Sequence, residues 1–144
     1  MVNRPVSGHA NQVAAGKRPF HTIIPGFLTR NGRPQMSFGV MGGNMQPQGH
    51  LQTLARMLVY QQQPQAACDA PRWKFSTGQS VDFESTTAPS LIDGLKRIGH
   101  RVDVVPDNYM DFGSGQFIWR LGDDMQDGYV AASDSRRDGQ AVGY

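Results

Sequence analysis

Cysteine is almost absent from this sequence, and so is any excess of charge of one sign. The single cysteine, Cys68, excludes an internal disulfide and any metal site built from several cysteines. The 14 basic and 12 acidic residues leave a net charge of +2, too small and too dispersed to indicate binding to nucleic acid or a membrane surface. No apolar run approaches the roughly 20 residues that span a bilayer. We therefore expect no nucleic-acid and no membrane partner.

Hydrophobic residues are also scarce, at 38% of the 144 residues, while glycine and proline occur 17 and 9 times. A chain of this length has the size of one domain, but this composition indicates either many turns or a piece that leans on another chain. Residues 1–16 show no apolar periodicity and predict a flexible arm or linker before a domain over residues 17–144. The N-terminal residues lack the apolar core of a signal peptide, so we expect a cytoplasmic protein.

The first half of the domain predicts a β-hairpin followed by a helix. Residues 22–28 are rich in β-branched and aromatic types, residues 35–40 alternate apolar and polar, and Asn31-Gly32 between them is a strong hairpin signal. Pro25 should mark a bulge or a sheet edge. Gly42-Gly43-Asn44 ends the second strand, and Asn44 is the expected N-cap of the helix. That helix should bury an apolar stripe formed by Leu51, Leu54, Ala55, Leu58 and Val59.

The second half predicts short strands around two further helices. Pro89 should open a helix capped by Thr86 or Thr87 and ended by Gly99. Its expected inward residues are Leu91, Ile92, Leu95 and Ile98. The remaining predicted elements are a short helix over 64–69, with Cys68 buried in it, and strands over 73–76, 80–84, 101–105, 116–121 and 128–132. The resulting order, β-β-α-α-β-β-α-β-β-β, is typical of an α+β fold.

The glycine pair between the second strand and the first long helix is the most informative local feature. Gly42-Gly43 allows the backbone to approach a ligand closely, and free N–H groups at a helix start can bind an anion or a developing oxyanion. Many strand-to-helix turns are rich in glycine for steric reasons alone. The local sequence leaves both interpretations open.

Other kinds of site find little support in the sequence. None of the four histidines forms a metal-binding spacing with another, and each has an ordinary structural explanation; they are His9, His21, His50 and His100. No serine stands in a Gly-x-Ser-x-Gly elbow, and no dinucleotide-binding or phosphate-binding glycine loop is present. We expect no metal and no cofactor.

Several motifs occur in a fixed order along the chain. They are Lys17-Arg18-Pro19, the Asn31-Gly32 turn, Gly42-Gly43 at a helix start, Asp69-Ala70-Pro71-Arg72, Ala132-Ser133-Asp134-Ser135-Arg136 and the terminal Gly143-Tyr144. From Lys17 to Tyr144 this order resembles the end of gamma-glutamyltranspeptidases. The stretches over 20–25 and 41–50 are similar to the branch that lacks a secretion signal and includes cephalosporin-acylase-like members.

The resemblance implies a fold and a chemistry. Members of the family are made as one precursor that cuts itself into two subunits, and the new N-terminal threonine of the small subunit is the nucleophile. They transfer a gamma-glutamyl group from glutathione or a related amide to water or an amino acid. Their fold is the four-layer αββα sandwich of N-terminal-nucleophile hydrolases. The α+β pattern of this chain is compatible with part of that sandwich.

The resemblance also assigns roles to particular residues. Gly42 and Gly43 match the glycine pair whose backbone amides form the oxyanion hole, so the resemblance favours the catalytic interpretation of this turn. His21 and Thr22 fall where other members carry two serines that touch the substrate carboxylate. Thr22 keeps a hydroxyl group, whereas His21 departs from the pattern. The matched residues Asp69, Pro71, Arg72, Asp134 and Arg136 are interpreted as scaffold.

The Thr-Thr-His segment that carries the nucleophile precedes this region in the family and has no counterpart in this sequence. Thr86-Thr87 is followed by Ala88, within the expected helix cap. Without its nucleophile the chain loses the covalent step, so we expect it to be inactive alone. Three hypotheses remain: an inert part of such an enzyme, one half of a split acylase completed by a separately encoded partner, or a non-catalytic binding domain. Missing strands should leave an exposed edge or apolar face, which predicts that the isolated chain forms oligomers or aggregates.

Overall fold

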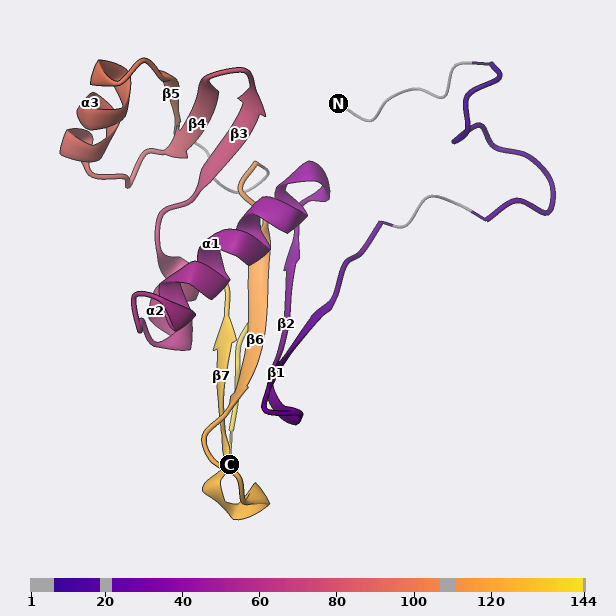
Figure 1. Ribbon diagram of the computed structural model, residues 1–144, viewed down its shortest axis with the longest axis vertical. Coiled ribbons are helices and arrows are strands. Elements are labelled where there is room, and N and C mark those ends of the chain that lie inside the picture. The colour runs from indigo at the N-terminus through magenta and orange to yellow at the C-terminus, as the bar shows by residue number, and fades with distance from the viewer. Residues whose placement is uncertain (1–6, 19–21, 107–110, 144) are drawn as a thin grey trace.

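The described residues form two β-sheets and three α-helices in an α+β structure, and the order of these elements along the chain is the predicted one (Figure 1). The computed structural model describes residues 7–18, 22–106 and 111–143. The larger sheet is antiparallel and contains β1 (Gly26–Arg30), β2 (Arg33–Met41), β6 (Ser114–Arg120) and β7 (Tyr129–Ser133), in the spatial order β1-β2-β6-β7. The smaller contains β3 (Trp73–Thr77), β4 (Ser80–Glu84) and β5 (Arg101–Val105). The helices are α1 (Gln46–Leu58), α2 (Pro64–Asp69) and α3 (Pro89–Arg97), with 3-10 turns η1 (Gly43–Met45) and η2 (Met125–Asp127).

The predicted first hairpin is confirmed, with Asn31-Gly32 as its turn. The φ angles of Asn31 and Gly32 are 53° and 77°, so both residues occupy the left-handed region that a type I′ turn requires. β1 begins at Gly26 rather than at residue 22, because Pro25 just before it has no N–H for a strand ladder. β1 is the edge strand of the sheet, and the hairpin's bulge lies between Leu28 and Thr29.

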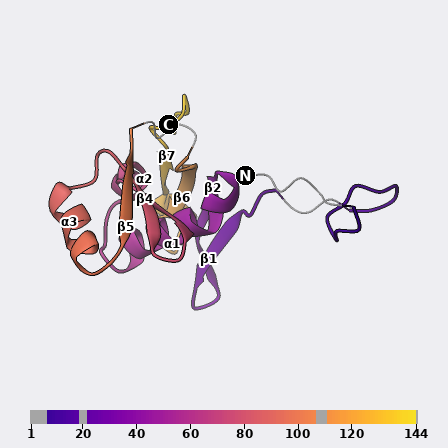
Figure 2. The ribbon, with the colours of Figure 1, turned by 90° about the horizontal axis from the view of Figure 1, so that it is seen from above.

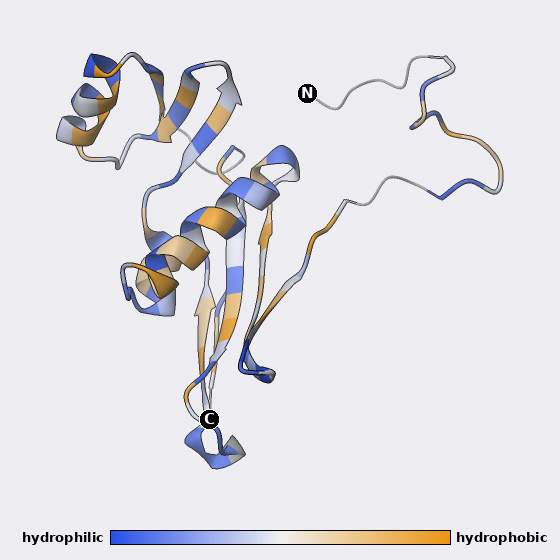
Figure 3. Cartoon of the chain, viewed as in Figure 1, coloured by the Kyte–Doolittle hydropathy of each residue, from blue (hydrophilic) through white to orange (hydrophobic). Residues whose placement is uncertain are grey.

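α1 lies across one face of the larger sheet, but the predicted stripe does not all face inward. Gly49, Thr53 and Met57 are the residues of α1 buried toward the sheet, and Leu54 packs at the margin of the core. Three residues of the predicted stripe are instead exposed: Leu51, Leu58 and Val59. The side of α1 seen in Figure 3 accordingly carries hydrophobic as well as hydrophilic residues. The prediction was wrong for these three residues.

A close approach between α1 and β2 explains which face turns inward. A Cβ atom added to Gly49 would lie only 2.5 Å from Cγ1 of Val40, so the helix can rest on the strand only where it carries glycine. Thr53, one turn further along, is buried because its hydroxyl donates to the carbonyl of Gly49 at 2.7 Å. The close approach of the first turns of α1 to β2 therefore sets which side of the helix faces the sheet. As a result, some of its leucines point toward solvent.

The core lies between α1 and α2 on one side and the inner face of the larger sheet on the other. Its buried residues are Met36, Val40, Met57, Ala67, Cys68, Phe117 and Ala132. The burial of Cys68 in α2 agrees with the sequence prediction. On the outer face, where alternate residues of the same strands point, each strand leaves one large apolar side chain exposed: Phe27, Met41, Ile118 and Tyr129.

The smaller sheet and α3 lie on the side opposite the β1–β2 hairpin (Figure 2). Ile92 of α3 is buried, but Leu91 and Ile98 are exposed, contrary to the prediction, because α3 packs mainly along a single strand, β5. The helix has Ala88 at its N-cap with no side-chain cap, so the predicted threonine cap is wrong. No helix in the described part of the chain has the length and apolar character to cross a membrane.

Candidate active site

Gly42 and Gly43 connect the end of β2 to α1 through the turn η1. Their φ angles are 130° and 56°, conformations that L-amino acids with a side chain rarely adopt. A Cβ atom on Gly42 would also lie 2.8 Å from the Cα of Gly113, whereas one on Gly43 would meet no atom within 4 Å. Gly42 is therefore required by packing and backbone angle, and Gly43 by backbone angle alone.

Among the described residues, the carbonyl groups of both glycines accept hydrogen bonds, whereas their N–H groups donate none. The carbonyl of Gly42 accepts from the N–H of Met45 at 3.0 Å, and the carbonyl of Gly43 accepts from the N–H of Gln46. No hydrogen bond within the described residues uses the N–H of Gly42 or Gly43, and both glycines are exposed. The turn thus presents two uncommitted donors at the surface, as the binding of an oxyanion requires.

The predicted cap of α1 differs from the observed one. Asn44 lies inside η1, and Met45 occupies the N-cap position without a side-chain hydrogen bond. Pro47 stands in the first turn of α1, where its missing N–H costs no helix hydrogen bond. The 3-10 turn replaces a side-chain cap because its own i to i+3 hydrogen bond holds the chain between the glycines and the helix.

The segment just before β6, which contains Phe112 and Gly113, packs against the glycine turn. Gly113 has a φ of 68°, and a Cβ atom there would lie 2.1 Å from the carbonyl oxygen of Met41. Nη1 of Arg72 donates to the carbonyls of Phe112 and Gly113 at 3.0 and 3.1 Å. A buried arginine therefore holds the backbone against which Gly42 packs.

Arg72 belongs to a buried cluster of four charged side chains. Its Nη2 lies 2.7 Å from Oδ2 of Asp134, and Nη1 of Arg136 lies 3.0 Å from Oδ1 of the same carboxylate. Arg136 also bonds Glu84 through Nε at 2.6 Å and Nη2 at 2.5 Å. These side chains are at most 3% exposed, and their two positive and two negative charges balance. This ionic cluster ties α2, β4 and the segment after β7 together, consistent with the scaffold role that the resemblance gives to three of its members.

The cluster shifts the pKa values of its members in opposite directions. Burial alone would raise the pKa of Asp134, but the charge of Arg72 and the N–H groups of Gly115 and Arg136 outweigh it and hold the pKa below its ordinary value. Burial would lower the pKa of Arg136, yet its hydrogen bonds to Glu84 and the charge of Asp134 raise it. Burial raises the pKa of the Cys68 thiol to about 12, and the charge of Asp134 adds to the effect. Cys68 is therefore no nucleophile at neutral pH.

The structure brings Thr22 into contact with the helix that follows the glycine turn. Thr22 is exposed, and its carbonyl accepts a hydrogen bond of 2.7 Å from Nε2 of Gln46, the first residue of α1. His21, the other predicted substrate-binding residue, lies outside the described residues. The contact between Thr22 and Gln46 was missed from the sequence, because a glutamine at a helix start carries no distinctive signal.

His50 has a structural role in the same region. Its Nε2 accepts a hydrogen bond of 3.0 Å from the N–H of Val40, and its ring packs edge-on against Phe38 with 4.9 Å between centroids. Burial lowers the pKa of His50, which favours the neutral ring that this accepting nitrogen needs. In the described part of the chain, no three side chains of histidine, cysteine, aspartate or glutamate gather to hold a metal ion.

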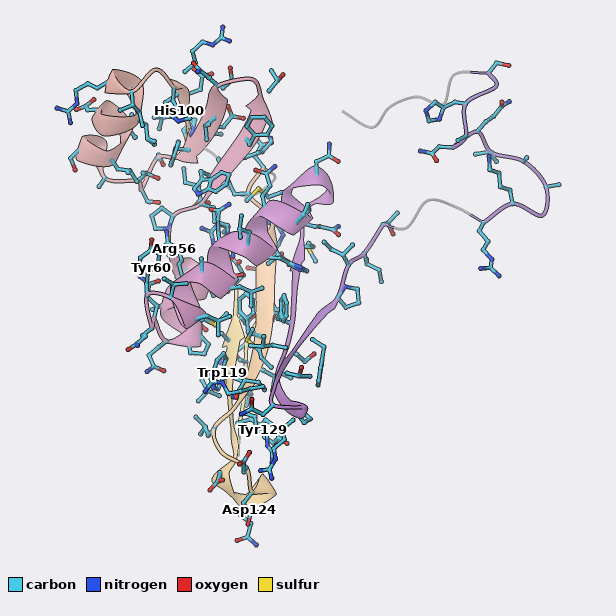
Figure 4. All side chains as sticks on the ribbon, in the orientation of Figure 1. Arg56, Tyr60, His100, Trp119, Asp124 and Tyr129 are labelled. Carbon is cyan, nitrogen blue, oxygen red and sulfur yellow. The ribbon has the colours of Figure 1, made fainter. Side chains whose placement is uncertain are left out.

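A surface hollow lies away from the glycine turn. It has a volume of about 280 Å³ and is lined by residues after the far end of α1 and by Trp119, Leu121 and Val130. Figure 4 labels Trp119 of β6, which lines the hollow, and Tyr60, which follows the end of α1. Because α1 has 13 residues, its two ends are about 20 Å apart. This hollow therefore does not lie beside Gly42 and Gly43.

Comparison with known proteins places the chain in a family. A sequence profile described as gamma-glutamyltranspeptidase matches residues 2–144. The chain belongs to the gamma-glutamyltranspeptidase family. It is 33% identical to the glutathione hydrolase-like YwrD proenzyme of Bacillus subtilis, over 94% of this chain and 26% of that protein. It is 34% identical to the oxamate amidohydrolase proenzyme of Klebsiella pneumoniae, with the same shares covered.

Solved structures of the family have the same fold. Cephalosporin acylase from Bacillus halodurans has a TM-score of 0.82 and 46% identity, over 95% of this chain and 25% of that chain. The gamma-glutamyltranspeptidase of Pseudomonas nitroreducens, at 23% identity and a TM-score of 0.75, matches in fold over 97% of this chain and 70% of that chain. The fold is that of N-terminal-nucleophile hydrolases, as predicted. The chain corresponds to the C-terminal region of the proenzymes and spans about a quarter of the length of the curated relatives.

Proposed function

We propose that the chain supplies the oxyanion hole and part of the substrate pocket of a gamma-glutamyl amide hydrolase or transferase. The observation that carries the proposal is the exposed turn of Gly42 and Gly43, whose two N–H groups donate to no acceptor in the part of the chain that the structure describes. Its support from the buried ionic cluster through Phe112 and Gly113 fits the fixed donor geometry that acyl transfer needs. Relatives named glutathione hydrolase favour glutathione-like substrates.

The chemistry divides between this chain and the rest of the enzyme. The Oγ of a threonine in the remaining part of the enzyme attacks the carbonyl carbon of the amide. The hydroxyl proton of that threonine passes to the threonine's own amino group, and the carbonyl oxygen becomes an oxyanion. The N–H groups of Gly42 and Gly43 donate to that oxygen. The carbon–nitrogen bond then breaks, the amine leaves with the proton, and water or an amino acid cleaves the resulting ester. His21 and Thr22 bind the substrate carboxylate in this proposal.

The partner in this proposal is the remaining part of the enzyme, either from the same precursor or from a separately encoded half. The exposed apolar side chains on the outer face of the larger sheet support the existence of such a partner, because covering them would remove apolar surface from water. These side chains are Phe27, Met41, Ile118 and Tyr129. This chain is inactive without that partner, because it contributes no nucleophile.

Reconstitution tests the proposal. The chain is co-expressed with the upstream part of the Bacillus halodurans acylase, the 46% identical relative, and assayed for p-nitroaniline release from gamma-glutamyl-p-nitroanilide. We expect turnover from the pair, none from this chain alone, and none when alanine replaces the partner's nucleophilic threonine. Substrate binding without turnover in every pairing would instead indicate the non-catalytic binding domain.

A second candidate is a related enzyme with a different acyl donor. The names of two relatives, oxamate amidohydrolase and cephalosporin acylase, favour it. The same reconstituted pair is therefore assayed with oxamate and with an acylated cephalosporin. Faster turnover of either than of the gamma-glutamyl amide would assign the site to that substrate.

A further inference from the structure

Gln46 is a buried polar side chain between the two parts of the proposed site. It is 7% exposed and is the first residue of α1, three positions after Gly43. Its backbone N–H donates to the carbonyl of Gly43, and its side-chain Nε2 donates to the carbonyl of Thr22 at 2.7 Å. One residue therefore bonds both the glycine turn and the segment that carries Thr22.

Two other glutamines of α1 show what such a contact does. Gln48 pairs with the backbone of Phe75, accepting from its N–H at 2.7 Å and donating to its carbonyl at 3.3 Å. Gln52 pairs in the same way with Trp73, at 3.0 and 2.8 Å. Each of these glutamine side chains bonds both the N–H and the carbonyl of one residue of β3, as the backbone of a paired strand does, and so holds β3 against α1. Gln46 has its contact on a different segment, the one that leads into β1.

We propose that Gln46 is a positioning residue that fixes Thr22 relative to Gly42 and Gly43 and so sets substrate affinity. The role rests on the proposed function, in which Thr22 binds the substrate carboxylate while the glycine amides bind its carbonyl oxygen. The hydrogen bond to Thr22 crosses 24 positions of sequence and is made by a buried donor, which costs free energy when left without an acceptor. Residues 22–25 are not part of a strand, so no strand hydrogen bonds fix the position of Thr22 in place of the bond from Gln46.

Hydrogen exchange on the isolated chain tests the contact itself. Gln46→Met keeps the length of the side chain and removes its donor, and Gln48→Met is the matched control on the same helix. Within peptides covering residues 22–27, the amides that can report the change are those of Gly26 and Phe27, which pair with β2. We expect these amides to exchange roughly tenfold faster in Gln46→Met, because the segment before β1 loses the hydrogen bond that holds it, and we expect no change there for Gln48→Met. Equal exchange in the two variants would overturn the proposal. Should Gln46→Met fail to fold, Gln46→Asn, too short to reach Thr22, replaces it.

Kinetics of the reconstituted pair test the consequence. Gln46→Met should raise KM for the gamma-glutamyl amide about tenfold and leave kcat within about twofold, because it loosens substrate binding and leaves the glycine amides in place. Gln48→Met should change neither. An unchanged KM for Gln46→Met would overturn the positioning role while the proposed function stands. An inactive wild-type pair would instead contradict the proposed function, and the exchange experiment would still decide whether Gln46 holds the Thr22 segment.

Discussion

At the scale of single residues, the buried charges carry the largest predicted energies. Asp134 is completely buried and accepts hydrogen bonds from Arg72, Arg136 and the N–H of Gly115. Asp134→Ala leaves two buried guanidinium groups facing a single carboxylate, and we expect the free energy of unfolding to fall by about 3–5 kcal/mol. Urea denaturation measures it.

A matched control for Asp134 lies at the surface. Asp123 pairs with Arg33 at 2.5 Å, but the two side chains are 71% and 63% exposed. Solvent screens such a pair, so Asp123→Ala should cost no more than about 1 kcal/mol. Equal losses for the two aspartates would show that burial of the ionic cluster contributes nothing to stability.

The single cysteine gives a second prediction at this scale. Cys68 is fully buried, and its raised pKa of about 12 keeps it a thiol at pH 8. Ellman's reagent should therefore label the folded chain at least roughly a hundredfold more slowly than the chain in 6 M urea, because labelling waits for local opening. Rapid labelling of the folded protein would contradict the observed packing of α2 on the sheet.

At the scale of elements, the turn between β2 and α1 contains two adjacent glycines that look equivalent in sequence but differ in what surrounds them. Gly42→Ala adds a clash with the backbone of Gly113 to an unfavourable φ, whereas Gly43→Ala meets only the unfavourable φ. We expect Gly43→Ala to cost about 1–2 kcal/mol of stability and Gly42→Ala clearly more, as measured by urea denaturation. Equal costs would show that Gly113 does not press against the turn.

Local chemistry explains which elements could be predicted from the sequence. The hairpin followed from Asn31-Gly32, because the turn's backbone angles are encoded in two adjacent residues. The spacing of apolar residues in α1 did not predict which side of the helix faces the sheet. Gly49 faces the sheet because Val40 leaves no room for a side chain, and that proximity joins residues on two different elements.

The candidate site was predictable only in part, for a similar reason. Gly42 and Gly43 stand next to each other in sequence, so their turn could be recognised. The supports around them are long-range: Arg72 and Asp134 are 62 positions apart, and Gln46 and Thr22 are 24 apart. Such pairs depend on the final packing of the chain, and no local spacing encodes them.

At the scale of the whole molecule, the chain exposes more surface than a self-contained domain of its mass. Its accessible surface is 10309 Å², whereas a folded monomer of 15.8 kDa should expose about 7300 Å². The arm over residues 7–18, which lies apart from the sheets, accounts for part of the excess (Figures 1 and 2). The uncovered apolar face of the larger sheet accounts for another part, in keeping with a chain that spans about a quarter of its relatives.

That uncovered face predicts how the isolated chain behaves. Because Phe27, Met41, Ile118 and Tyr129 lie on one face of four paired strands, two copies can bury these side chains against each other. Sedimentation velocity should show self-association of the wild-type chain, and Ile118→Glu should reduce it by placing a charge in the middle of the face. Leu91→Glu, on the exposed side of α3, is the control and should leave self-association unchanged. A monodisperse wild-type monomer would contradict the prediction. An equal effect of both variants would mean that the contact is not specific to the sheet face, which is the face the proposed partner has to cover.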